Sequence, residues 1–202
     1  LLALRCAENG IRHVVISPGS RSAPLVIAFS NQKNITTSVI PDERVAGYYA
    51  LGMAQQLQAP VAVICTSGTA VLNLAPAICE AFYQNLPLLA ITADRPIGAH
   101  LQGENQAILQ HDVYRNYVGI SIALDGEDTT HENLCHLEKK IDNSFSILQN
   151  SNALPVHWNV HLQEPLYGTA DSSAAFKSIA AKTDVGPQEV FEDVTDLQNR
   201  WN

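Results

Sequence analysis

The sequence has few basic residues, and they form no cluster along the chain. Lys and Arg number 12 against 20 Asp and Glu, and the formal net charge is −8. The absence of a basic stripe argues against a general nucleic-acid surface. If the ligands are anions, a few local arginines must bind them against the field of the whole protein.

Long apolar runs are also missing. No stretch is long enough to cross a bilayer, and the start has no charged region followed by a cleavage site. We therefore expect a cytoplasmic protein without a membrane span. The chain starts inside one helix pattern and ends inside another, so we also expect a piece of a longer protein.

The four cysteines form no C-x-x-C pair, and most of them lie in apolar helix or strand patterns. This placement favours buried, reduced thiols over disulfides or zinc ligands. His157 and His161 share one face of a predicted strand with Asn159, but nothing supplies the further ligands that a metal needs. We expect no metal bound by this chain.

What the chain does have is a regular alternation of strand and helix patterns. Strands are predicted at 13–16, 35–40, 61–66, 86–92, 117–124 and 155–162. Helices are predicted at 24–29, 42–54, 70–83 and 133–149, and a polar loop at 95–115. Such alternation predicts an α/β fold with a doubly wound parallel sheet and helices on both faces. Ligands of these sheets bind beyond the carboxyl ends of the strands.

A change in composition divides the chain. Between Thr169 and Thr183 the residues are mostly Ser, Ala, Thr and Lys, which is typical of a linker, and a helix pattern starts at Pro187. We predict one domain over residues 1–165. Residues 166–202 are predicted to form a linker and the first helix of a further domain.

The turn Ser17–Ser22 (S-P-G-S-R-S) follows the first predicted strand and opens a helix. Backbone N–H groups and the helix dipole at such a turn attract an anion, and Arg21 adds a planar fork suited to a carboxylate. The turn is neither a Walker loop nor G-x-G-x-x-G. The alternative is an ordinary tight turn in which Ser22 caps the helix.

Glu43 falls in the first turn of the next predicted helix, where the dipole stabilises a carboxylate. The alternative is a solvated glutamate that merely helps to start the helix. A functional role is favoured by two further polar turns at strand ends, Ser67-Gly-Thr69 and Ala93-Asp-Arg-Pro96.

Six motifs in this order together resemble the pyrimidine-binding domain of the thiamine-diphosphate enzymes. The motifs are S-P-G-S-R-S (17–22), D-E-R (42–44), T-S-G-T-A (66–70), N-L-A-P (73–76), T-A-D-R-P (92–96) and N-Q-A-I (105–108). Within that superfamily, the first, fifth and sixth are most similar to the 2-succinyl-5-enolpyruvyl-6-hydroxy-3-cyclohexene-1-carboxylate synthases of menaquinone biosynthesis. The resemblance covers about residues 1–165.

The resemblance implies a role for each matching residue. Glu43 matches the glutamate that hydrogen-bonds N1′ of the cofactor's aminopyrimidine and favours the tautomer that deprotonates the thiazolium ring. The other implied cofactor-binding residues are Ser67, Gly68, Thr69 and Asn73. The implied substrate-binding residues are Ser20, Arg21, Arg95, Asn105 and Gln106. The implied reaction is that of a transferase, which decarboxylates 2-oxoglutarate and adds the succinyl unit to isochorismate.

One part of the family's apparatus has no counterpart here. The family holds the cofactor's diphosphate through Mg²⁺ (or Mn²⁺) at a G-D-G segment of a separate C-terminal domain. The nearest match, Asp125-Gly-Glu-Asp128, lacks the leading Gly and follows the wrong strand. The resemblance therefore implies a site shared between subunits of a homodimer or homotetramer, and a chain that is inactive alone. Another thiamine-diphosphate carboligase or lyase, or a non-catalytic ligand-binding α/β domain, remains the alternative.

Overall fold

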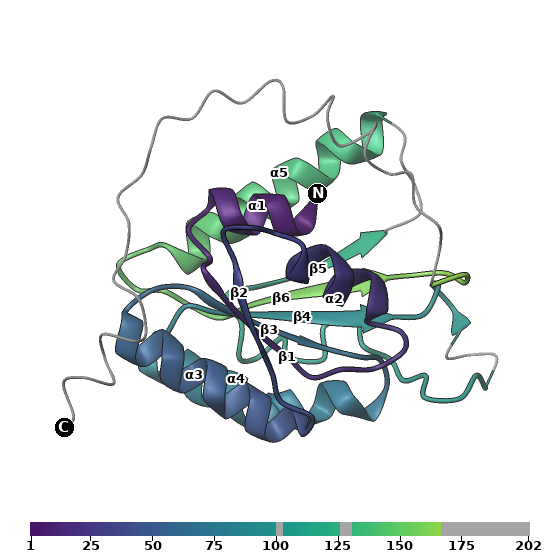
Figure 1. The fold of residues 1–202 in the computed structure, drawn as a ribbon, viewed down its shortest axis with the longest axis horizontal. Coiled ribbons are helices and arrows are strands. Elements are labelled where there is room, and N and C mark those ends of the chain that lie inside the picture. The colour runs from purple at the N-terminus through teal and green to yellow at the C-terminus, as the bar shows by residue number, and fades with distance from the viewer. Residues whose placement is uncertain (100–102, 126–130, 167–202) are drawn as a thin grey trace. The chain divides into compact units, whose positions relative to one another are not determined.

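The computed structural model describes residues 1–99, 103–125 and 131–166, and within them it shows an α/β fold (Figure 1). The strands are β1 (His13–Ile16), β2 (Thr36–Val39), β3 (Val61–Cys65), β4 (Leu88–Asp94), β5 (Ile120–Asp125) and β6 (Val156–His161). The helices are α1 (Leu2–Glu8), α2 (Ala23–Ser30), α3 (Glu43–Leu57), α4 (Thr69–Gln84) and α5 (His131–Leu148). Each strand and helix predicted within the described residues is confirmed to within a few residues.

The six strands form one parallel sheet in the order β2-β1-β3-β4-β6-β5. The chain passes from β1 outward to β2 and then returns to β3 on the other side of β1. This reversal brings the turns after β1 and β3 together: the Ser17 N–H donates to the Ile64 carbonyl at 2.8 Å. A Cβ on Gly19 would lie 2.4 Å from the Cβ of Thr66. Doubly wound sheets bind their ligands at such a reversal.

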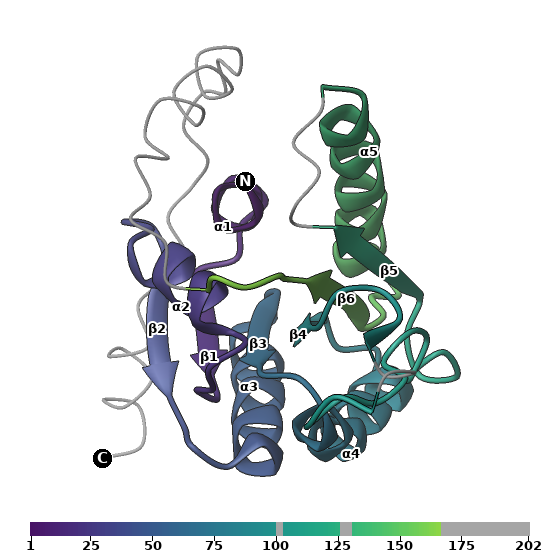
Figure 2. The same cartoon turned by 90° about the vertical axis from the view of Figure 1, so that its right-hand side faces the viewer.

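Helices cover both faces of the sheet, as predicted. Helices α1, α2 and α5 lie on one face, and α3 and α4 lie on the other (Figures 1 and 2). Each face of the sheet has its own hydrophobic core. Successive strand residues point to opposite faces, so Val14 packs in the core under α1, α2 and α5, and Val15 in the core under α3 and α4. Every residue of β3 and β4 is buried, which explains their nearly continuous apolar sequences.

One local prediction is wrong. Ser22 does occupy the N-cap position of α2, but its hydroxyl makes no capping bond to the helix. It donates instead to the Gly19 carbonyl, at 3.0 Å, so it tightens the preceding turn. Asp42, by contrast, caps α3, because its Oδ1 accepts the Val45 N–H at 3.0 Å.

Some predictions fall outside the described residues. The linker and the helix starting at Pro187 lie beyond residue 166, and most of the Asp125-Gly-Glu-Asp128 turn lies in 126–130. Among the helices that the structure describes, none is long and apolar enough to span a membrane.

Candidate functional site

The predicted site residues lie along the edge of the sheet where the strands end. Because all six strands are parallel, the turns after β1, β2, β3 and β4 share this edge. Glu43 is the first residue of α3 and is partly buried. The Asn73 Nδ2 lies 3.5 Å from its Oε2, a long contact between the starts of α3 and α4. Burial, and after it the charge of Glu43, raise the pKa of the Cys65 thiol at the end of β3.

The environment of Glu43 suits a heterocyclic ligand. In residues 1–99, 103–125 and 131–166, the structure gives its carboxylate no cationic partner and only the contact with Asn73. A carboxylate in the first turn of a helix is stabilised in its charged form. Its oxygens accept hydrogen bonds only, which is what a protonated ring nitrogen requires.

The turn after β3 is built around Gly68. Its backbone has φ +81° and ψ −142°, a region that essentially only glycine adopts. A Cβ at this position would lie 2.5 Å from the carbonyl oxygen of Gln106. The Ser67 side chain is buried beside it, whereas Thr69 is exposed at the first position of α4. The turn therefore lies in direct contact with the polar segment that carries Gln106.

Arg95 joins these two segments. Its Nη1 donates to the Ser67 Oγ at 2.6 Å and to the Gln106 carbonyl at 2.8 Å, and its Nε lies 3.2 Å from a carboxylate oxygen of Glu104. Asn105 and Gln106 have exposed side chains, and Gln106 has a left-handed φ of 54°. The structure thus brings together four of the predicted site residues. They are Ser67 and Gly68 in the turn after β3, Arg95 at the end of β4 and Gln106 in the segment 103–110.

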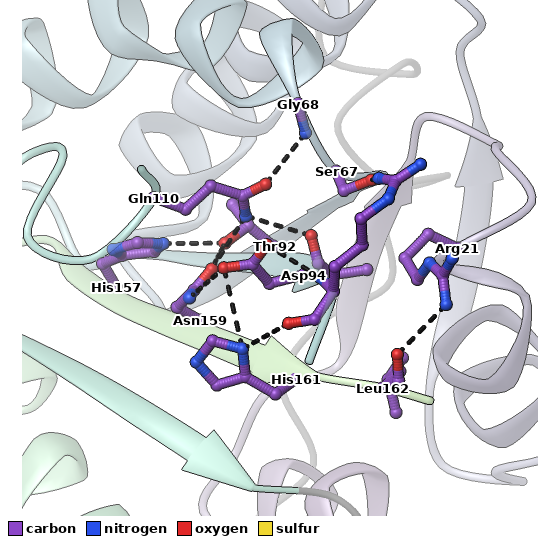
Figure 3. A network of polar contacts seen from close by, with 12 residues as sticks. Arg21, Ser67, Gly68, Thr92, Asp94, Gln110, His157, Asn159, His161 and Leu162 are labelled. Atoms are coloured by element: carbon purple, nitrogen blue, oxygen red, sulfur yellow. Dashed lines mark hydrogen bonds and ion pairs between the residues drawn. The ribbon is translucent and has the colours of Figure 1, made fainter. Parts of the chain in front are cut away.

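Arg21 and Ser20 lie at the same edge but have other partners. The Arg21 Nη1 donates to the carbonyl of Leu162 at 3.1 Å, and its Nη2 lies 3.2 Å from a carboxylate oxygen of Glu164. Its side chain is only 12% exposed, whereas Ser20 is exposed. Figure 3 shows the Arg21 guanidinium directed toward Leu162, with which it makes this hydrogen bond. The segment that follows β6 therefore holds the Arg21 fork in place.

Beneath these turns lies a buried polar network that sequence reasoning missed (Figure 3). Gln110 bonds the backbone N–H of Gly68 and the side chain of Asn159, both at 2.8 Å. Asn159 in turn donates to Asp94 at 2.8 Å, and the Nδ1 of His161 lies 2.6 Å from the carbonyl oxygen of Arg95. The register of β4 against β6 sets Asp94 opposite His161. No local signal marks Gln110, since it stands in a polar stretch that predicts an exposed loop.

Sequence comparison identifies the family. The model of the N-terminal TPP binding domain of the thiamine pyrophosphate enzymes matches residues 1–114. The chain belongs to the thiamine pyrophosphate enzyme family. Thiamine pyrophosphate is another name for thiamine diphosphate, so this confirms the resemblance drawn from the six motifs.

Individual relatives show which members of this family the chain is similar to. A protein of Flavobacterium psychrophilum is 43% identical over 98% of this chain and 34% of its own length. One of Desulfotalea psychrophila is 47% identical over 83% of this chain and 31% of its own. Both are named 2-succinyl-5-enolpyruvyl-6-hydroxy-3-cyclohexene-1-carboxylate synthase, as is a relative in Staphylococcus epidermidis, 41% identical over 78% of this chain and 28% of its own. The chain spans about a third of the length of these relatives.

In this TPP-binding domain, the hydrogen bonds around His157 determine which of its two ring nitrogens carries the proton. The one hydroxyl proton of Thr92 goes to the Asn159 Oδ1, at 2.9 Å. The Nε2 of His157, 2.8 Å from the Thr92 oxygen, must therefore donate to it. The Nδ1 then accepts from the Ser121 hydroxyl at 3.1 Å. Burial, with a smaller effect from His111, lowers the pKa of His157 to about 3, so the ring is neutral.

His157 also does not fit a metal-binding role, because both of its ring nitrogens are occupied in this network. Over the described ranges, no group of three or more His, Cys, Asp or Glu is placed to hold a metal ion.

The lowered pKa of His157 predicts a pH dependence of stability. Below about pH 6.5 the unfolded chain binds a proton at this ring, but the folded protein does not until the pH approaches about 3. Between these values the free energy of unfolding should fall by up to about 1.4 kcal/mol per pH unit. Denaturant unfolding at pH 7 and pH 5 should show this loss in the wild type and a smaller one in His157→Gln. Equal losses in both proteins would exclude His157 as the source.

Proposed function

We propose that this chain is the N-terminal domain of a thiamine-diphosphate-dependent transferase, a 2-succinyl-5-enolpyruvyl-6-hydroxy-3-cyclohexene-1-carboxylate synthase. The reaction would decarboxylate 2-oxoglutarate and add the succinyl unit to isochorismate. The observation that carries the proposal is the grouping of Glu43 with Ser67, Gly68 and Arg95 along one sheet edge. The names of the relatives, at about 40% identity or more, support it.

Five residues would hold the pyrimidine half of the cofactor. When bound, thiamine diphosphate supplies a nucleophilic carbon and takes up the electrons released by decarboxylation. Glu43 would accept a hydrogen bond from N1′ and keep a proton on that atom. Gly68 would let the chain turn closely beside the ring, because its φ of +81° and ψ of −142° are a conformation that essentially only glycine adopts. The remaining three are Ser67, Thr69 and Asn73.

The substrate end would lie on the other side of the turn after β3. Both proposed substrates are dianions, and two guanidiniums supply planar forks that match a carboxylate. Arg95 and Arg21 would provide these forks, and Ser20, Asn105 and Gln106 would add hydroxyl and amide groups from exposed positions.

The rest of the site would come from outside this chain. We propose that a further domain holds Mg²⁺ and the diphosphate, and that the site forms between subunits of a homodimer or homotetramer in the cytoplasm. Residues 1–165 would be the pyrimidine-binding domain and 166–202 would lead to the next one.

The direct test is an assay of the full-length protein with thiamine diphosphate, Mg²⁺, 2-oxoglutarate and isochorismate. We expect carbon dioxide and the succinyl adduct to form together. Decarboxylation with transfer to another acceptor would favour a different carboligase. Failure to bind thiamine diphosphate in calorimetry would favour a non-catalytic ligand-binding domain.

Replacing Arg21 with Lys tests the substrate end. A point charge does not reproduce the planar fork, so kcat/KM should fall by about one to two powers of ten, or roughly 1.4 to 2.7 kcal/mol. Affinity for thiamine diphosphate should hardly change. The readouts are steady-state kinetics with each substrate varied and a cofactor titration.

Arg12→Lys is the matched control for this substitution. Arg12 precedes β1 at the opposite edge of the sheet, and its guanidinium donates to the Ala7 carbonyl. This variant should keep the constants of the wild type. If Arg21→Lys also keeps both substrate constants, Arg21 only holds the turn against β6.

A further inference from the structure

Gln110 has no role in the proposed function, yet its side chain is almost completely buried, with 1% of its surface exposed. Its carboxamide bonds three separate segments (Figure 3). The Oε1 accepts the Gly68 N–H at 2.8 Å. The Nε2 donates to the Ala93 carbonyl at 3.0 Å and to the Asn159 Oδ1 at 2.8 Å. Both amide protons of this side chain and one of the two acceptor positions of its oxygen are thus used.

The orientation of the Gln110 carboxamide can be followed from Asp94, at the other end of the network. The Asp94 carboxylate only accepts hydrogen bonds, so Asn159 must turn its Nδ2 toward Asp94, 2.8 Å away. The Asn159 Oδ1 then faces Gln110, which must present its Nε2 there and its Oε1 to Gly68. The orientation that follows from Asp94 through Asn159 is thus the same one that the Gly68 N–H and the Ala93 carbonyl require of Gln110.

The segments that Gln110 joins are those that hold Arg95. The guanidinium donates to Ser67, next to Gly68, and to the carbonyl of Gln106, four residues before Gln110. The two segments touch, since a Cβ on Gly68 would lie 2.5 Å from that carbonyl oxygen. A change in their separation would move both acceptors of the guanidinium.

We propose that Gln110 is a positioning residue for Arg95. Its bonds hold the Ser67–Gly68 turn against residues 103–110, and this places the guanidinium that receives a substrate carboxylate. The inference rests on the proposed function. A displaced guanidinium weakens the binding of an anionic group without altering the reacting carbon, so the loss falls on KM rather than on kcat.

The test is a double-mutant cycle of Gln110→Met and Arg95→Met in the full-length protein. Met fills a space close to that of Gln without its donors and acceptor. Gln110→Met should raise the KM of a dianionic substrate about ten-fold and change kcat less than about three-fold. In the Arg95→Met background it should add almost nothing to KM. Equal increases in both backgrounds would overturn the proposal, because Gln110 would then act independently of Arg95.

Ser144→Ala is the matched control for a general loss of stability. The Ser144 hydroxyl is fully buried and accepts from the Trp158 Nε1 at 3.0 Å. Trp158 belongs to β6, like Asn159, but points to the opposite face of the sheet. This control should leave KM unchanged. If it raises KM as much as Gln110→Met does, the proposal is wrong.

Hydrogen–deuterium exchange separates this inference from the proposed function. An inactive wild type would contradict the function but leave the joining of the two segments open to measurement. Gln110→Met should speed exchange in peptides covering 66–70 and 103–110, and Ser144→Ala should not. Unchanged exchange in Gln110→Met would overturn the inference whatever the enzyme assay shows.

Discussion

Replacing Glu43 with Gln in the full-length protein should lower the turnover of carboligation by about two to four powers of ten. Gln keeps the shape of the side chain and can still hydrogen-bond N1′ of the pyrimidine. It has no negative charge, however, and so cannot stabilise the proton that Glu43 is proposed to keep on that nitrogen. The loss should appear in the chemical step, in single-turnover experiments as well as in kcat.

The structure explains why this substitution should leave the fold intact. The N-cap of α3 is Asp42, whose carboxylate accepts the Val45 N–H, so Glu43→Gln removes no cap. The lost interaction with the helix dipole is worth only about 0.3 to 1 kcal/mol. Circular dichroism and thermal unfolding should therefore be close to those of the wild type.

Glu80→Gln serves as the control for Glu43→Gln. Glu80 is an exposed glutamate of α4 that contacts Gln84 one turn further on. Its replacement removes the same charge away from the sheet edge and should leave turnover unchanged. Near-normal turnover in Glu43→Gln, with the control also active, would remove Glu43 from the mechanism.

The sequence could predict the elements of the fold because local patterns determine them. The apolar run before Thr66 and the one before Thr92 predict strands covered on both faces, and β3 and β4 are fully buried. Asp42 is a good N-cap residue in any context, and it does cap α3. Strict alternation of strands and helices leaves few arrangements other than a parallel sheet.

The sequence could not predict the contacts that depend on the order of the strands. Gln110 is buried because β6 lies beside β4, which brings Asn159 next to Thr92. That neighbour is 49 residues away from Gln110 along the chain. The partners of Arg21 are similarly remote, since Leu162 is 141 residues away. Ser22 has the right residue type for a cap, but its backbone has φ −82° and ψ −2°, not the extended conformation from which a capping oxygen reaches the helix N–H groups.

The conformation of Gly68 predicts a large loss of stability when a single methyl group is added there. Gly68→Ala must hold a side chain at φ +81° and ψ −142°, which costs about 1 to 3 kcal/mol. The new Cβ would also lie 2.5 Å from the Gln106 carbonyl oxygen, and relieving that overlap costs about as much again. We expect a combined loss of roughly 2 to 6 kcal/mol in the free energy of unfolding. Denaturant titration of the full-length protein, read with a probe in this domain, measures it.

Gly10→Ala is the matched control for Gly68→Ala. Gly10 has the same φ of +81°, but no atom lies within 4 Å of the Cβ that Ala would add there. Backbone strain alone should lower the free energy of unfolding by about 1 to 2 kcal/mol at this position. The excess loss in Gly68→Ala over Gly10→Ala then combines any further backbone strain at ψ −142° with the contact between the turn after β3 and the segment that carries Gln106. Because Arg95 takes one acceptor from each, this excess should come with a higher KM for the anionic substrate. Equal losses in the two variants would mean that the segments separate easily, and the turn could not then place Arg95.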